Sequence, residues 1–168
     1  MGVYGLLAEA FTYPHPALLA ELQAGLAGLG RRHPAQPGLA AFCTRIARLS
    51  LEEWEELATR TLDLSPAAAP YVGFQIWGDS YPRGEFMSKL NRAMYELDID
   101  PAGELPDHVT PVLRYLDAAA APLPELVEHL PVAVTRMLAI LREKDQDNPY
   151  VSLFEAVLAA AEGLRVKA

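Results

Sequence analysis

Cysteine is nearly absent from this 168-residue sequence, in which Cys43 is the sole example. One cysteine excludes an internal disulfide, and sparse use of cysteine is typical of proteins from a reducing compartment. The first residues also lack the basic segment and the long apolar core of a secretory signal. These absences predict a cytoplasmic protein.

Long hydrophobic runs and an excess of basic charge are missing too. Charged residues or prolines interrupt every apolar stretch before it reaches the roughly 20 residues that cross a bilayer, so we expect no membrane span. The formal net charge is −8, and the basic residues form no stripe with interleaved aromatic residues. Because such a chain repels a phosphate backbone, we expect no nucleic-acid partner.

The common sequence motifs of catalysis are not found either. There is no glycine-rich phosphate-binding loop, no dinucleotide-binding turn and no G-x-S-x-G nucleophile elbow. The four histidines lie far apart, and none has the spacing to a cysteine or carboxylate that metal sites usually require. Cys43 lies on an apolar stripe, where a thiol is inert. These features favour a protein that is not an enzyme.

Apolar residues recur at helical spacing through almost the whole chain, and the alternation typical of half-buried strands is nearly absent. Residues 71–77 are the only stretch in which a strand competes with a helix, and we expect a helix there. A chain of this length buries enough surface for one core. The sequence therefore predicts an all-α protein with a single domain over residues 1–168.

Local chemistry predicts several helix boundaries. Ser50 and Glu53 fit a capping box, in which each side chain accepts a hydrogen bond from the other residue's amide. Pro82 is suited to the start of a helix, because a first-turn proline loses no hydrogen bond. Residues 31–38 are expected to form a loop. Pro131 interrupts a long apolar stripe, which predicts either two helices or one kinked helix.

Residues 77–84 hold polar and aromatic side chains that helical patterning alone does not explain. The rings of Trp77 and Tyr81 flank a glycine-bearing turn, and Arg83 is placed to reach a carboxylate or a carbonyl. Aromatic rings with one polar group often line peptide grooves. The alternative is that both rings belong to the ordinary core and that Arg83 is a surface charge.

Residues 104–108 form a second polar stretch. Pro106 restricts the residue before it to an extended shape, and Asp107 is then placed to cap the helix that follows. This arrangement puts His108 at the start of that helix. Glu104, Asp107 and His108 would supply acceptors to a cationic or peptide ligand. A plain junction between a loop and a capped helix is the alternative.

In order and spacing, the two stretches resemble the signature of NarJ-type chaperones of the TorD/DmsD family. They read G-D-S-Y-P-R-G at 78–84 and, about 20 residues later, E-L-P-D-H at 104–108. An early aromatic helix over Leu7 to Tyr13, which ends at a Tyr-Pro pair, supports the resemblance. An Asn-Pro-Tyr sequence at 148–150 that leads into a final helix does so too. Together these features cover most of the chain.

The resemblance implies a helical bundle of the TorD-like type that is not an enzyme and permanently binds no cofactor. Family members bind the N-terminal, leader-like segment of the catalytic subunit of a molybdenum reductase. They hold that unfolded or unassembled subunit while its bis-molybdopterin guanine dinucleotide cofactor is inserted. The NarJ branch serves the respiratory nitrate reductase, so the implied role is nitrate reductase assembly in nitrate assimilation. Either a monomer or a dimer is compatible with this role.

Transferred residue by residue, the resemblance implies a client-binding site built from both motifs. To the residues that match the motifs we add two aromatic side chains on chemical grounds. The expected site comprises Asp79, Arg83, Gly84, Glu104, Pro106, Asp107 and His108 from the motifs, together with Trp77 and Tyr81.

One departure from the family pattern leaves the client open. NarJ-type sequences usually carry histidines just before the G-D/E-S element, where this chain has residues 75–77 as Gln-Ile-Trp. A TorD-family chaperone for a dimethyl sulfoxide, selenate or perchlorate reductase is therefore an alternative. Outside the family, the alternatives are a small helical enzyme that uses Glu104, Asp107 and His108 as an acid-base group, and a helical scaffold without a client.

Overall fold

The computed structural model describes residues 1–63 and 67–167, and all regular elements within these ranges are helices. The predicted all-α class is confirmed. The elements in chain order are α1 (Val3–Ala10), α2 (Leu18–Leu29), α3 (Gln36–Ile46), α4 (Leu51–Ala58), the π-helical turn η1 (Thr59–Asp63), α5 (Val72–Trp77), α6 (Tyr81–Glu96), α7 (Val109–Ala118), α8 (Pro124–Asp145) and α9 (Tyr150–Lys167). None of the helices in these ranges has the length and apolarity needed to span a membrane.

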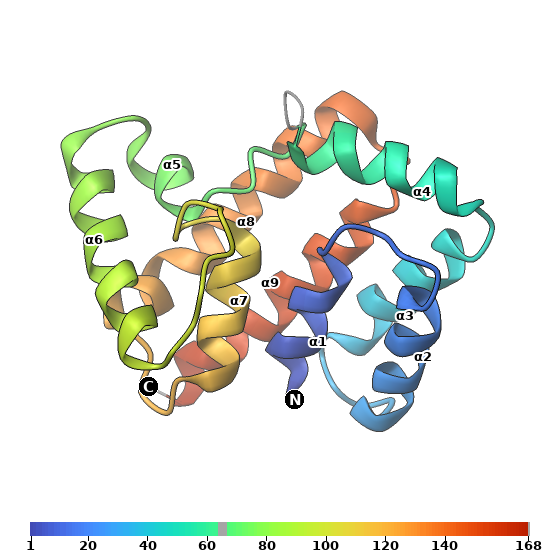
Figure 1. Ribbon diagram of the computed structural model, residues 1–168, viewed down its shortest axis with the longest axis horizontal. Helices are drawn as coiled ribbons and strands as arrows, with labels where there is room; N and C mark the ends of the chain where they lie inside the picture. The colour runs from blue at the N-terminus through green and yellow to red at the C-terminus, as the bar shows by residue number, and fades with distance from the viewer. Residues whose placement is uncertain (64–66, 168) are drawn as a thin grey trace.

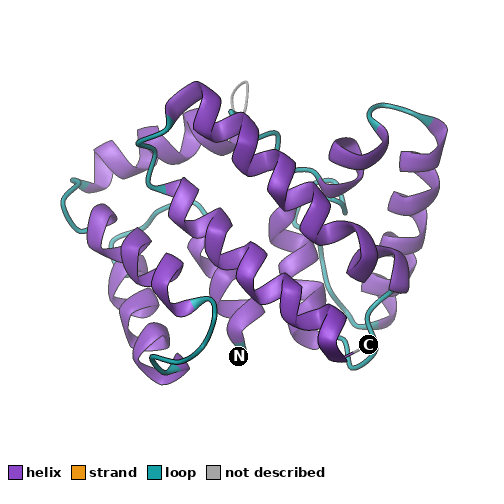
Figure 2. Cartoon of the chain, turned by 180° about the vertical axis from the view of Figure 1, so that it is seen from behind, coloured by secondary structure: helices purple, strands orange, loops and turns teal. Residues whose placement is uncertain are grey.

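The C-terminal helix α9 is the centre of the packing. It packs against α8, α3 and α1, and α1 in turn packs against α7 (Figure 1). Seen from behind, α8 and α9 run side by side (Figure 2). Helices α2 to α4 lie at one end of the molecule and the α5–α6 pair lies at the other, where α5 packs against α8. The site described below lies where α7 begins, between these two ends.

The inner face of α9 carries one of the apolar stripes that recur at helical spacing in the sequence. Its members recur every three or four residues, so they share one face of the helix. Five of its seven residues have no exposed surface, namely Tyr150, Leu153, Phe154, Val157 and Ala161, while Leu158 and Leu164 are half-buried. Burial of a large apolar side chain contributes about 1.5–3 kcal/mol. Val151, Ala156 and Ala160, outside the stripe, are buried as well, so α9 is covered on more than one face.

Two side-chain caps fix the ends of helices in this core. Ser50 and Glu53 form the predicted capping box at the start of α4, with N···O distances of 2.9 Å and 3.1 Å. Asn148 accepts a hydrogen bond from the Tyr150 amide through Oδ1 at 2.9 Å and donates one to Thr61 Oγ1 at 2.9 Å. Asn148 therefore joins η1 to the first turn of α9.

The structure decides several predicted boundaries. Residues 72–77 are helical as expected, and α8 continues through Pro131 as one helix. The loop predicted over residues 31–38 is shorter, since α3 begins at Gln36 and accepts a proline in its first turn. The predicted early helix is present, but it ends before Tyr13, because α1 spans Val3–Ala10. The proline after Tyr13 disfavours helical backbone at that residue.

Candidate functional site

A buried ion pair joins the two polar stretches. Arg83, in the first turn of α6, donates hydrogen bonds from Nε to Asp107 Oδ2 at 3.0 Å and from Nη2 to Asp107 Oδ1 at 3.3 Å. The Asp107 side chain is fully buried and that of Arg83 is 12% exposed. Paired contacts of this kind fix both distance and orientation. Arg83 and Asp107 therefore bind α6 to the start of α7.

Backbone hydrogen bonds support this pair from the other side. The Val72 amide donates to the Asp107 carbonyl at 2.8 Å, and the Val109 amide donates to the Pro70 carbonyl at 2.9 Å. Between them, Tyr71 and His108 form an antiparallel bridge. The segment before α5 is thus tied to the segment before α7.

Gly73 lies where a side chain would enter this cluster. Its amide donates to Asp107 Oδ2 at 3.1 Å. A Cβ at this position would lie 2.9 Å from Asp107 Oδ2, 3.1 Å from Arg83 Cγ and 3.2 Å from Phe86 Cδ2. Such distances are shorter than normal contacts, so a side chain at position 73 would displace atoms of the ion pair.

Gly73→Ala is expected to lower the free energy of unfolding by about 1–3 kcal/mol, the usual cost of overpacking a filled interior. Gly84→Ala on α6 is the matched control, because a Cβ there meets no atom within 4 Å. That control is expected to gain about 0.5–1 kcal/mol from the better helix propensity of alanine. Urea unfolding of both variants measures the difference. Equal effects of the two changes would contradict this role of Gly73.

The predicted cap of α7 by Asp107 is wrong. The N-cap residue is His108, whose Nδ1 accepts a hydrogen bond from the Thr110 amide at 3.1 Å. The Asp107 carboxylate instead accepts hydrogen bonds from Arg83 and from the Gly73 amide. Asp107, one position before the N-cap, therefore makes tertiary contacts, and His108 caps the start of the helix.

The His108 ring is enclosed but incompletely satisfied. Its side chain is 5% exposed, and its Nε2 has no hydrogen-bond partner. Oε2 of Glu104 lies 3.5 Å from Nε2, longer than a well-formed hydrogen bond. Burial lowers the pKa of His108 to about 4, although the nearby charges of Asp63 and Asp107 act in the opposite direction. The imidazole is therefore neutral at physiological pH.

Glu104 and His108 line a hollow of about 310 Å³ between the segment after α1, the end of η1 and the start of α7. Its apolar lining comes from residues such as Phe11, Leu62 and Pro111. The charged side chains in the same lining are Asp63, Glu104 and Arg114. The hollow thus combines apolar surface with carboxylates.

A second hollow of about 370 Å³ adjoins the first, and Tyr13 lines both. The Tyr13 ring is 59% exposed, and its hydroxyl donates to Glu55 Oε2 at 3.1 Å. The second hollow is further lined by residues of α4 and η1, which are Glu52, Glu55, Glu56, Thr59 and Arg60. We call the two hollows, with Tyr13 between them, the acidic groove. Its carboxylates outnumber its guanidinium groups, so it favours cationic ligands.

The structure separates the nine residues predicted to bind a client into four groups. Arg83 and Asp107 meet in the buried ion pair, and Glu104 and His108 meet at the acidic groove. Trp77 packs on the rings of Phe86 and His129, with centroid distances of 5.1 Å and 5.0 Å. The other four lie apart from these contacts: Pro106 is half-buried, while Asp79, Tyr81 and Gly84 are exposed. None of residues 77–84 is among the described residues that line the groove.

The sequence motifs did not identify Tyr13, Asp63 or the glutamates of α4 as groove residues. Of these residues, only the glutamates could have been found from the sequence. Glu52, Glu55 and Glu56 have the spacing of one helical face, which predicts an acidic surface on α4. Tyr13 and Asp63 come to the groove through the packing of distant segments. Local pattern does not encode that packing.

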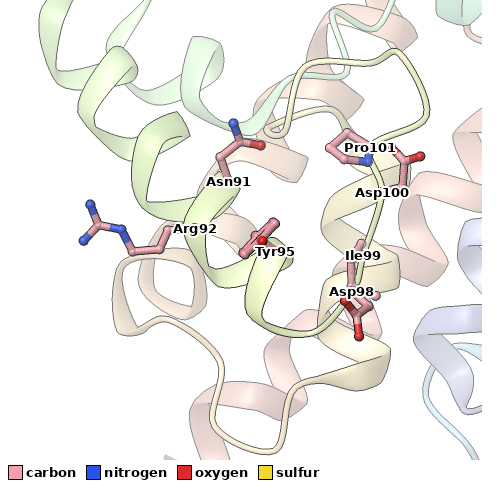
Figure 3. A pocket seen from close by; sticks show the side chains of 7 residues that line it. All are labelled: Asn91, Arg92, Tyr95, Asp98, Ile99, Asp100 and Pro101. Carbon is pink, nitrogen blue, oxygen red and sulfur yellow. The ribbon is translucent and has the colours of Figure 1, made fainter.

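Another hollow, of about 590 Å³, lies between the end of α6 and the loop that follows it. Figure 3 shows Tyr95 facing the 98–101 loop, while Arg92 extends away from it. Tyr95 is 83% exposed, so this is an open surface of the α6 end. It shares only Pro101 with the acidic groove.

Comparison with models of known protein families finds no match, and comparison with curated protein sequences finds none. The role of the acidic groove is therefore argued from its geometry and from the resemblance of the two motifs.

Proposed function

We propose that the protein is a TorD-like cytoplasmic chaperone that binds the N-terminal segment of the catalytic subunit of a molybdenum reductase. By its motifs, the client is a respiratory nitrate reductase that awaits insertion of bis-molybdopterin guanine dinucleotide. The observation that carries the proposal is the place of the E-L-P-D-H motif. Its glutamate and its histidine line a groove that is apolar inside and rich in carboxylates.

The groove matches the chemistry of a leader-like segment that carries both an apolar face and basic side chains. A volume of about 310 Å³ lies at the lower end of the range for ligand pockets, about 300–1,000 Å³. Apolar side chains of the client would enter beside Phe11 and Leu62, and basic ones would meet Asp63 and Glu104. No step of this mechanism forms or breaks a covalent bond.

The motif residues have two different roles. Arg83 and Asp107 hold the segment before α7 in place, and Glu104 and His108 touch the client. This division differs from a site in which all nine residues contact the peptide. It places Asp79, Tyr81 and Gly84 outside the groove and adds Tyr13 and Asp63 to it.

Isothermal titration with a synthetic peptide of the client's N-terminal segment tests the proposal. We expect binding that weakens as salt is raised, because screening acts on the charge pairs. Glu104→Gln and Asp63→Asn should each weaken binding by up to about fivefold, since an exposed charge pair contributes up to about 1 kcal/mol. Glu162→Gln on the exposed face of α9 is the control and should bind as the wild type does. Equal affinity for a scrambled peptide would refute the proposal.

A panel of N-terminal peptides assigns the client. The nitrate reductase peptide is expected to bind more tightly than those of dimethyl sulfoxide, selenate and perchlorate reductases. Tighter binding of one of the other three would keep the chaperone role and change the client.

A further inference from the structure

The tautomer of His108 follows from its contacts. Nδ1 accepts a hydrogen bond from the Thr110 amide, so Nδ1 carries no hydrogen. A neutral imidazole carries its single hydrogen on the other ring nitrogen. His108 therefore presents an Nε2–H group, which is a donor.

This donor is held in place without an acceptor. The backbone bridge between Tyr71 and His108 fixes the main chain, and the Tyr71 ring packs against the imidazole with a centroid distance of 5.2 Å. Nε2 itself is buried and has no hydrogen-bond partner, because Oε2 of Glu104 at 3.5 Å lies beyond a well-formed hydrogen bond, although His108 lines the acidic groove. A buried donor without an acceptor is unfavourable, so a ligand that supplies one gains affinity. The fixed ring loses little entropy when it binds.

The charges of the groove decide which acceptor fits. Asp63 and Glu104 line the same hollow, against Arg114 alone. This excess of negative charge disfavours a carboxylate or a phosphate beside Nε2. A neutral carbonyl that lies next to a basic side chain satisfies both the donor and the carboxylates.

We propose that His108 Nε2–H donates a hydrogen bond to a backbone carbonyl of the bound client, while Glu104 pairs with a basic side chain next to that carbonyl. This inference rests on the proposed function and names the atom by which the groove holds the client's main chain. Because a carbonyl is present at every residue, this hydrogen bond does not depend on the client's sequence. The carboxylates of the groove select the client's sequence through its basic side chains.

Two substitutions separate this role from the helix cap. His108→Asn keeps an acceptor near the place of Nδ1, as N-cap asparagines do, but has no donor at the place of Nε2. His108→Gln carries its amide donor near the place of Nε2 and lacks the cap acceptor. Titration with the client peptide should show about a tenfold loss of affinity for His108→Asn. His108→Gln should stay within about threefold of the wild type, given the usual strength of a neutral hydrogen bond.

The outcomes distinguish the inference from the function on which it rests. If the wild type binds the peptide and His108→Asn binds it with the same affinity, the inference is overturned and the proposed function stands. An equal loss of affinity in His108→Asn and His108→Gln has the same meaning. A wild-type protein that binds none of the four reductase peptides overturns the proposed function and the inference with it.

Nitrogen NMR of the wild-type imidazole tests the inference without any variant. The free protein should show the hydrogen on Nε2, and the client peptide should shift that proton downfield and slow its exchange. A hydrogen on Nδ1 in the free protein, or an Nε2–H resonance that the bound peptide leaves unchanged, overturns the inference.

Discussion

Asp107→Ala is expected to lower the free energy of unfolding by about 3–5 kcal/mol, the usual result of removing one partner of a buried ion pair. The loss arises because the guanidinium of Arg83, whose side chain is 12% exposed, would remain inside without a counter-charge. The Gly73 amide would lose its acceptor as well. A loss of this size is a large fraction of the stability of a small domain, about 5–15 kcal/mol. Urea unfolding at neutral pH measures it.

An exposed ion pair provides the control. Lys89 and Glu125 join α6 to α8 with side chains that are 56% and 43% exposed. Lys89→Ala is expected to change stability by at most about 1 kcal/mol. In a double-mutant cycle, Arg83→Ala combined with Asp107→Ala should cost less than the sum of the single changes, because the second change removes the orphaned charge. Additive losses would show that the two side chains do not act as a pair.

Periodicity predicts the helices well because it reports which face of each helix is buried. The stripe of α9 is an example, since five of the seven residues at its spacing have no exposed surface and the other two are half-buried. The capping box at Ser50 and Glu53 is predictable for a related reason: both partners lie within one turn of each other. Elements whose determinants are local can therefore be read from the sequence.

The role of Asp107 could not be predicted from its neighbours in the sequence. A carboxylate just before a helix is commonly an N-cap, and sequence predicts that role here. The partner that decides its actual role, Arg83, lies 24 positions earlier in the chain. The Asp107 carboxylate pairs with Arg83 instead, and His108, a less usual N-cap residue, caps the start of α7.

The candidate site was partly predictable for the same reason. The two motifs do meet, through Arg83 and Asp107, but the meeting point is buried and the groove lies beside it. The α1–α7 contact brings the segment at Tyr13 to the start of α7, and η1 adds Asp63. No spacing in the sequence encodes that approach. The motifs thus locate the site, and long-range packing selects which of their residues face a ligand.

As pH falls, protonation of His108 is expected to lower the free energy of unfolding at a higher pH than general acid denaturation does. Burial lowers the pKa of this imidazole from 6.5 to about 4, so the unfolded chain binds a proton more readily than the folded one. The stabilising contribution is complete above pH 6.5 and is lost as pH falls toward 4. The size of the loss is on the order of 3 kcal/mol, since one pKa unit corresponds to about 1.4 kcal/mol. Protonation would also place a second hydrogen on Nδ1, where the Thr110 amide donates.

The difference between wild type and His108→Gln isolates this effect. The other three histidines and the carboxylates that face His108, at positions 63, 104 and 107, are present in both proteins, so their titrations largely cancel. Urea unfolding at steps between pH 7 and pH 4 should show the wild type losing its advantage over the variant as pH falls. The midpoint of the wild-type imidazole, followed by NMR, should lie well below 6.5. Parallel stability curves would mean that folding does not bury this histidine in its neutral form, and the donor to the client's backbone would then be lost as well.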